Sequence, residues 1–179
     1  PETWQVAFFT LRVSGTATLI SVLLGIPLGL ALGLKEFPGR RLLISLVNTG
    51  MALPPVVVGL WVFIFLGRYG PLGFMGLLYT PSAIVIAQTV IAAPVVAGFT
   101  IAGIGQLDPQ LSLQIQALGA SKRQLYWVLI REARLSIMAA VIAGFGAAVS
   151  EVGASMMVGG NIKGYTRVLT TATVMETSR

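Results

Sequence analysis

The chain has 179 residues, of which 55% are hydrophobic and 10% are charged, and its formal net charge is +6. Ordinary soluble domains carry about 25% charged residues. A soluble globular protein is therefore excluded, because too few polar side chains remain to cover its surface. The absence of Cys and His also excludes thiol chemistry, disulfide bonds and metal sites built from these two ligands.

Four apolar stretches are long enough to cross a bilayer, which requires about 20 apolar residues in a helix. They run from Val13 to Leu34, from Leu42 to Leu66, from Pro81 to Ile104 and from Leu135 to Val158. The predicted fold class is therefore all-α: a polytopic bundle of transmembrane helices, with four spans.

The first stretch carries small residues at steps of four along the helix. Small side chains at this spacing allow a neighbouring backbone to approach closely in lipid. Pro27 lies among them and predicts a bend in the helix. The small residues are Ala17, Ser21, Gly25, Gly29 and Gly33.

The second stretch contains Asn48 and then two adjacent prolines, Pro54 and Pro55. These prolines remove two backbone donors and disfavour a helical conformation before them. Carbonyl groups freed in this way must face protein or water rather than lipid. Two interpretations stay open at this point: a break that lines a polar pathway, or a simple kink in a packed helix.

The fourth stretch is rich in small residues and contains one carboxylate, Glu151, directly after Ser150. At a rise of 1.5 Å per residue, Glu151 is expected about 25 Å along the helix, near its outer end. An intramembrane carboxylate indicates a function. At the expected depth it could instead be hydrated, or paired with a basic group.

The basic residues favour one orientation in the membrane and do not form a nucleic-acid site. If the spans alternate, two connections with seven basic residues lie on one side, which the positive-inside rule makes cytoplasmic. These are Lys35, Arg40, Arg41, Lys122, Arg123, Arg131 and Arg134, against Arg12, Arg68, Lys163, Arg167 and Arg179 on the other side.

The connection 106–134 on the cytoplasmic side predicts two short helices. Asp108 and Pro109 form a helix start, Gly119 is suited to a left-handed helix end, and Ser121 with Gln124 forms a capping box. Apolar residues fall on one face of each helix and are expected to hold the pair against the membrane. These residues are Leu111, Ile115 and Leu118 in the first helix, and Leu125, Val128 and Leu129 in the second.

The sequence Leu118-Gly119-Ala120-Ser121, followed by an aromatic pair and a new span, resembles the coupling loop of bacterial ABC importer permeases of type I. That family commonly has Glu-Ala-Ala before this point and Leu-Pro after it, where this chain has Leu113-Gln114-Ile115 and Arg131-Glu132. The resemblance implies that the loop docks on a cytoplasmic ATPase through Ala117, Leu118, Gly119, Ala120, Ser121 and Lys122.

Further segments are similar to the oxyanion branch of these permeases, which handles tungstate, molybdate and sulfate. The segment from Gly159 to Arg167, together with Arg131-Glu132-Ala133-Arg134, is most similar to tungstate-type permeases. The resemblance implies that residues 1–179 form one permease domain, and we expect one span to be missing at each end. The other segments that carry it are Gly25 to Gly29, Leu53 to Gly59, Gly70 to Gly73 and Glu151 to Ala154.

The chain contains no phosphate-binding loop of the Gly-x-x-x-x-Gly-Lys type and no nucleophile with a His base. It is therefore predicted not to be an enzyme and to hold no cofactor, with ATP and Mg²⁺ bound by a partner. The resemblance implies a second permease copy, two cytoplasmic ABC ATPase subunits and a periplasmic or extracellular oxyanion-binding protein.

A multiply charged oxyanion requires a polar route through the bilayer, and nine residues are candidates for its pathway or gate. The alternatives are a permease for another solute such as sulfate, or a non-transporting membrane scaffold that recruits a cytosolic protein. The candidate residues are Asn48, Pro54, Pro55, Ser150, Glu151, Asn161 and Thr166, with Lys163 and Arg167 as cations at the mouth.

Overall fold

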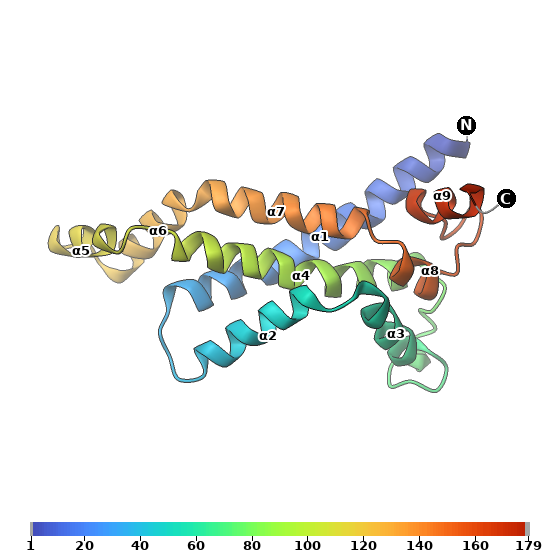
Figure 1. The fold of residues 1–179 in the computed structure, drawn as a ribbon, viewed down its shortest axis with the longest axis horizontal. Coiled ribbons are helices and arrows are strands. Elements are labelled where there is room, and N and C mark those ends of the chain that lie inside the picture. The colour runs from blue at the N-terminus through green and yellow to red at the C-terminus, as the bar shows by residue number, and fades with distance from the viewer. Residues whose placement is uncertain (1, 178–179) are drawn as a thin grey trace.

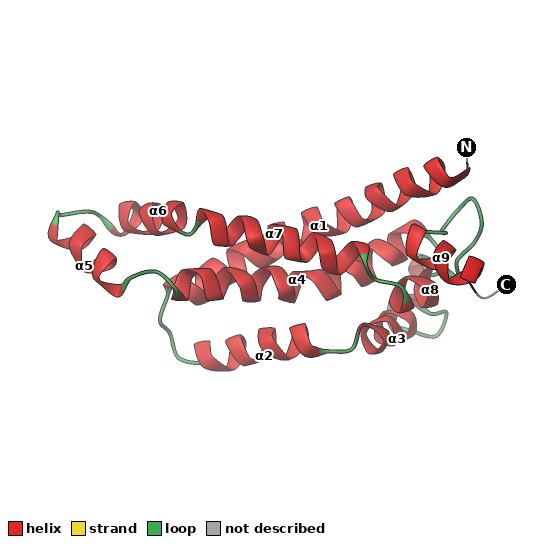
Figure 2. Ribbon diagram, turned by 45° about the horizontal axis from the view of Figure 1, so that its top comes forward, coloured by secondary structure: helices red, strands yellow, loops and turns green. Residues whose placement is uncertain are grey.

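The computed structural model describes residues 2–177, so Arg179, counted above among the basic residues, lies outside the described residues. Within this range the chain forms helices joined by turns, with no strand (Figure 2). The helices are α1 (Glu2–Leu34), α2 (Arg40–Ala52), α3 (Pro55–Leu66), the 3-10 turn η1 (Gly73–Met75), α4 (Pro81–Gly105), α5 (Pro109–Ala117), α6 (Lys122–Glu132), α7 (Arg134–Val149), α8 (Gly153–Gly159) and α9 (Leu169–Thr177).

The bundle is elongated, with different structures at its two ends (Figure 1). The end that carries α5 and α6, here called the hairpin end, also carries the connection 35–39 between α1 and α2. The opposite end, called the far end, carries α8, α9 and the connection 67–80 between α3 and α4. The two basic connections identified in the sequence thus lie at the same end of the molecule.

Two helices are long and apolar enough to span a bilayer alone, over Thr3–Leu34 and Pro81–Gly105. Two further helix pairs meet the same criterion only together, and both are bent, so the chain has two to four spans. The first helix begins at Glu2 rather than at Val13, and it continues through Pro27 to Leu34 without interruption.

The predicted glycine stripe is where α1 packs against α4. A Cβ atom on Gly29 would lie 2.6 Å from Cβ of Thr100 and 2.8 Å from the carbonyl oxygen of Ala97. A Cβ on Gly25 would lie 2.9 Å from Cβ of Val96, and one on Gly33 would lie 2.9 Å from Cβ of Ile104. Because these glycines have no side chain, the backbone of α1 packs directly against α4.

A sharp break separates α2 from α3, which is one of the two outcomes that the adjacent prolines left open. The helices meet at 100°, which is a break rather than a kink. Leu53 and Pro54 take extended ψ angles of 130° and 127°, as expected for residues that precede proline. The carbonyl oxygen of Pro54 accepts hydrogen bonds from the amides of Val57 and Val58, so α3 begins with few unpaired donors.

The fourth apolar stretch is not one helix, contrary to the prediction. The helix α7 ends at Val149, α8 begins at Gly153, and the two are bent by 57°. The Ser150 hydroxyl donates to the carbonyl oxygen of Gly146 at 2.7 Å, and the following residues leave the helical path. No proline marks this break, so neither hydrophobicity nor residue spacing revealed it.

The two breaks lie next to each other, because α3 and α8 pack closely. A Cβ on Gly59 would lie 2.6 Å from Cα of Ala154, and one on Gly153 would lie 2.9 Å from a methyl group of Val56. Val58, Val62 and Leu66 of α3 share a buried core with Ala154 and Val158 of α8. The second helix of the first broken pair, α3, therefore packs on the second helix of the other broken pair, α8.

The glycine stripe gives a test of this packing. Gly29→Ala should destabilise the folded protein by about 1–3 kcal/mol, the usual effect of overpacking a tight contact. The matched control is Gly15→Ala in the same helix, where an added Cβ meets nothing within 4 Å; it should be neutral or stabilising by up to about 1 kcal/mol. Thermal unfolding in detergent would measure both, and equal midpoints would contradict the close contact.

Candidate functional site

The connection at the hairpin end folds as the capping signals predict. Asp108 caps α5, because its carboxylate accepts a hydrogen bond from the amide of Gln110 at 2.8 Å, and Pro109 occupies the first turn. The capping box of α6 is also present: the Ser121 amide donates to Oε1 of Gln124 at 2.8 Å, and the Gln124 amide donates to the Ser121 hydroxyl at 3.4 Å. Both helix starts are therefore fixed by side chains.

Gly119 forms the turn between the two helices. Its φ angle is +79°, a left-handed conformation that a residue with a Cβ adopts only at a penalty. The amide of Gly119 donates to the carbonyl of Gln116, and the amide of Ala120 donates to that of Ile115, as in common helix C-terminal motifs. We call the unit of α5, Gly119 and α6 the hairpin.

The tip of the hairpin differs from the prediction at Leu118. This residue was expected on the packed face with Leu111 and Ile115, but it is 87% exposed, whereas Leu111 and Ile115 are half-buried. The reason is that α5 ends at Ala117, and Leu118 already belongs to the turn. Ala117 and Lys122 beside it are exposed too, so the hairpin presents an apolar tip flanked by a cation.

The second helix of the hairpin is anchored on one side and open on the other. Leu129 is buried and Leu125 and Val128 are half-buried, as the apolar spacing predicts. Trp127 is exposed, and the Arg131 guanidinium lies over its ring at 5.3 Å from the centroid, a cation–π contact.

Glu151 completes the break between α7 and α8. Its side chain is only 6% exposed, and Oε1 accepts a hydrogen bond from the amide of Ala154 at 2.7 Å. Its own carbonyl oxygen accepts from the Thr170 hydroxyl at 3.0 Å. The side chain is thus buried rather than at an open surface, and among the described residues it has no ion pair with a basic group. It caps the start of α8.

Threonine hydroxyls join the elements of the far end, and of these threonines only Thr166 was a candidate from the sequence, for the pathway rather than for this structural role. Thr166 is buried; its hydroxyl donates to the carbonyl of Gly159 at 2.5 Å and accepts from the amide of Ile162 at 2.9 Å. Thr10 of α1 accepts from the amide of Leu169 at 2.9 Å, at the start of α9. The loop 160–168 is thereby tied to α1, α8 and α9.

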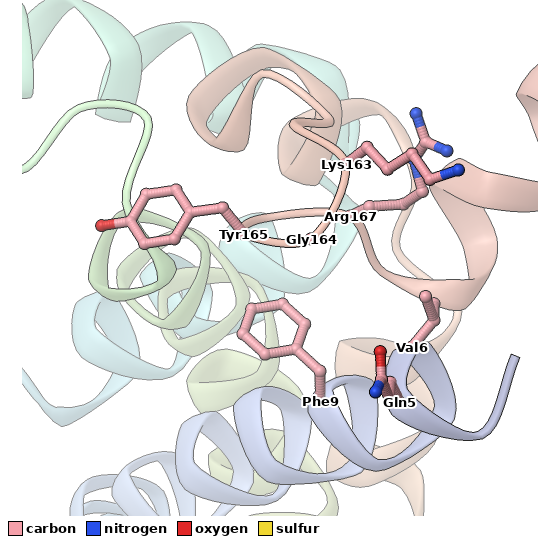
Figure 3. Close-up of a pocket in the computed structure, with 7 residues that line it drawn as sticks. All are labelled: Gln5, Val6, Phe9, Lys163, Gly164, Tyr165 and Arg167. Atoms are coloured by element: carbon pink, nitrogen blue, oxygen red, sulfur yellow. The ribbon is translucent and has the colours of Figure 1, made fainter. Parts of the chain in front are cut away.

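The two predicted cations of this loop lie together. Lys163 and Arg167 line a cavity of about 390 Å³ with Gln5 and Val6 of α1, and a neighbouring one of about 530 Å³ along α9. Figure 3 shows both side chains extending from the loop in the same direction. Asn161 lies near the start of the loop with a φ of +48°, and its buried Oδ1 has no hydrogen-bond partner among residues 2–177.

The remaining candidates are separate from this cluster. Asn48 lies on α2 and is exposed, as are Pro54 and Pro55 at the first break. Ser150, at the end of α7, is exposed as well. The predicted residues thus fall in four places: the hairpin, the helix α2, the two adjacent breaks, and the loop 160–168.

The chain matches the family described as the inner membrane component of binding-protein-dependent transport systems, over residues 25–177. It belongs to this family. Members are membrane components of transport systems, so the chain is a transport protein and not itself an enzyme. The match includes the hairpin, both breaks and the loop 160–168, which lie within the matched residues.

Several relatives in this family are similar over nearly the whole chain. The tungstate uptake system permease protein TupB of Peptoclostridium acidaminophilum is 42% identical over 99% of this chain and 78% of its own length. A probable anion ABC transporter permease protein of Haloferax volcanii is 40% identical, over 93% and 74%. The molybdenum transport system permease protein ModB of Escherichia coli is 29% identical, over 96% and 78%.

The cap at the second break can be tested in this permease. Glu151→Ala removes the acceptor of the Ala154 amide and should destabilise the protein by about 1–2 kcal/mol, the usual effect of losing a helix cap. Glu151→Gln keeps an acceptor oxygen and should retain most of the stability. Hydrogen exchange at residues 153–156 should accelerate in the Ala variant alone. Equal exchange in the two variants would show that the carboxylate does not hold α8.

Proposed function

We propose that the chain is the permease subunit of an ATP-binding-cassette importer that moves an oxyanion across the cytoplasmic membrane, with tungstate as the first substrate to test and molybdate as the second. The observation that carries the proposal is the capped hairpin at one end of a membrane bundle. It is supported by two relatives of the chain, a tungstate permease and a probable anion permease, which are 42% and 40% identical to it.

The topology follows from the two bent pairs. We assign four spans: α1, α2 with α3, α4, and α7 with α8. The hairpin end then faces the cytoplasm, because both basic connections lie there. Residues 1–179 form one permease domain in this assignment.

The hairpin is suited to receive force from a separate subunit. Its tip presents exposed Leu118, Ala117 and Lys122, which fit a partly apolar groove on an ATPase. The capped, short helices resist bending, so a displacement of the tip is passed to α4 and α7, which flank the hairpin in the chain. ATP and Mg²⁺ are bound by that ATPase and not by this chain.

The complex we propose contains two copies of this permease, two ATPases and a soluble binding protein that delivers the anion at the far end. ATP binding draws the ATPases and both hairpins together, so that the spans rock and the pathway opens outward. Hydrolysis and product release reverse the motion. A dianion needs this route, because transfer of an unpaired charge into hydrocarbon is prohibitive.

The candidate pathway residues take different parts in this mechanism. Asn48 and Ser150 are exposed polar groups at membrane depth and are assigned to the pathway wall, next to the break at Pro54 and Pro55. Lys163 and Arg167 attract the anion at the far end. The buried residues Glu151 and Thr166, with Asn161, hold the break and the loop in shape.

The turn of the hairpin provides a test of coupling. Gly119→Val forces a β-branched residue to a φ of +79°, a strain of about 1–2 kcal/mol or more. It should abolish binding-protein-stimulated ATP hydrolysis while leaving membrane insertion intact. The matched control is Gly76→Val at the far end, where φ is +60° and the added Cβ likewise meets nothing; this variant should remain coupled. Normal uptake by Gly119→Val would count against the hairpin as the coupling element.

Reconstitution in vesicles distinguishes a transporter from a non-transporting scaffold. In vesicles that contain the permease and its ATPase, the oxyanion-loaded binding protein should stimulate ATP hydrolysis several-fold and drive accumulation of the anion. A scaffold that only recruits a cytosolic protein should give no stimulation. Competition among tungstate, molybdate and sulfate in the same vesicles identifies the substrate, and preferential uptake of sulfate would replace the oxyanion assigned here.

A further inference from the structure

The helix α2 has a packed face toward α4. Val47 is buried on this face, Gly50 lies against the ring of Pro94, and Met51 fills the space beside Gly98. At 100° per residue, these positions span one side of the helix. The rest of α2 is therefore not covered by the described part of the chain.

The uncovered part of α2 consists of two chemically different faces. One carries Leu42, Leu43 and Leu46, which are 66%, 40% and 58% exposed. Leu43 and Leu46 also line an aliphatic cavity of about 300 Å³ shared with α1 and α4. A purely aliphatic surface of this kind suits lipid chains.

The other uncovered face is polar and carries Arg41, Ser45, Asn48 and Thr49, all of them exposed. These positions repeat at helical spacing, so they lie on one face of α2. One turn further along the same face is Ala52, the last residue of the helix. The Thr49 hydroxyl bonds to the carbonyl of Ser45 at 2.8 Å. The Asn48 amide and the Ser45 hydroxyl have no hydrogen-bond partner in residues 2–177.

A polar face cannot be turned to hydrocarbon when the same helix offers a leucine face for that purpose. Polar side chains in a membrane normally face a water-filled cavity or another polar group. Asn48 lies about 10 Å further along the helix axis than Arg41, so the polar face runs from the hairpin end toward the middle of the bilayer. We therefore expect this face of α2 to meet water or another polar surface at this depth.

We infer that this face of α2 is the wall of the anion route on the hairpin side of the break, with Arg41 as the cation at its inner mouth. The inference rests on the proposed function. Charge complementarity identifies the occupant: a guanidinium, an amide and hydroxyl groups are the donors that a hydrated oxyanion requires. Arg41 is available for this role, unlike Arg40, whose Nε donates to the carbonyl of Leu32 at 2.6 Å.

The polar face ends at the break before α3. The exposed side chains of α3 include Val56, Leu60, Trp61 and Ile64, which are all apolar. Beyond Pro54 the route must therefore leave this pair of helices for another wall. The bend of 100° is the point at which the polar face stops.

Cysteine accessibility tests the inference in the assembled complex, because the chain has no cysteine of its own. Single Cys variants are made at Ser45 and Asn48, with Leu46→Cys as the matched control on the leucine face. The complex in inside-out vesicles is treated with a water-soluble, anionic methanethiosulfonate. Thiols ionise far more readily in water than in hydrocarbon, so Ser45→Cys and Asn48→Cys should react about tenfold faster than the control, and tungstate should slow them.

Uptake gives an independent measurement. Arg41→Gln should reduce the rate of anion uptake by about tenfold, the effect of losing one charge–charge contact of about 1.4 kcal/mol, whereas Arg41→Lys should retain most of it. Unchanged uptake in Arg41→Gln would show that Arg41 does not act on the anion in the route.

Other results would overturn the assignment of the polar face. Equal labelling of both faces, or no effect of the anion in a complex that transports it, would show that α2 does not line the route. Disulfide formation between two copies through Asn48→Cys, without labelling, would show that the face is an interface between copies. If the parent complex transports no oxyanion, the proposed function fails, and the labelling contrast still decides whether the face is wet.

Discussion

Hydrocarbon offers no hydrogen-bond partner to a peptide group, so a chain in the bilayer can leave its helical path only where other atoms complete the bonds. This constraint determines the two broken pairs of this permease. At the first break a proline lacks the donor altogether, and the carbonyl of Pro54 accepts two amides of the next helix. At the second break a carboxylate, Glu151, accepts the amide of Ala154. At each break, a nearby acceptor thus bonds to amides at the start of the next helix.

Because of these two breaks, the bundle contains a stiff part of long, closely packed helices and an angled part in which the chain changes direction. The stiff part is α1 with α4, whose backbones meet through glycines. The angled part consists of α3 and α8, which pack on one another. The hairpin follows α4 directly and precedes α7, so in the proposed mechanism motion at the hairpin reaches the stiff part through α4 and the angled part through α7.

The sequence predicted best where a feature depends on neighbouring residues. Asp108, Gly119 and Ser121 fixed the hairpin because each acts on its own backbone or on amides a few positions away. The break at Pro54 was predictable for the same reason. The break at Glu151 was not, because its bond to Ala154 forms only when α8 turns onto α3, which is a tertiary event. The exposure of Leu118 was missed because the helix ends one residue before it.

The threonine bonds at the far end were beyond sequence analysis too, since Thr10 and Leu169 are joined across 159 positions of the chain. These bonds have a consequence for the medium in which the far end works. Hydroxyl-to-backbone contacts involve no formal charge, so their strength does not depend on Debye screening. These hydroxyl bonds between α1, α8 and α9 should therefore weaken little as the salt concentration around the far end rises.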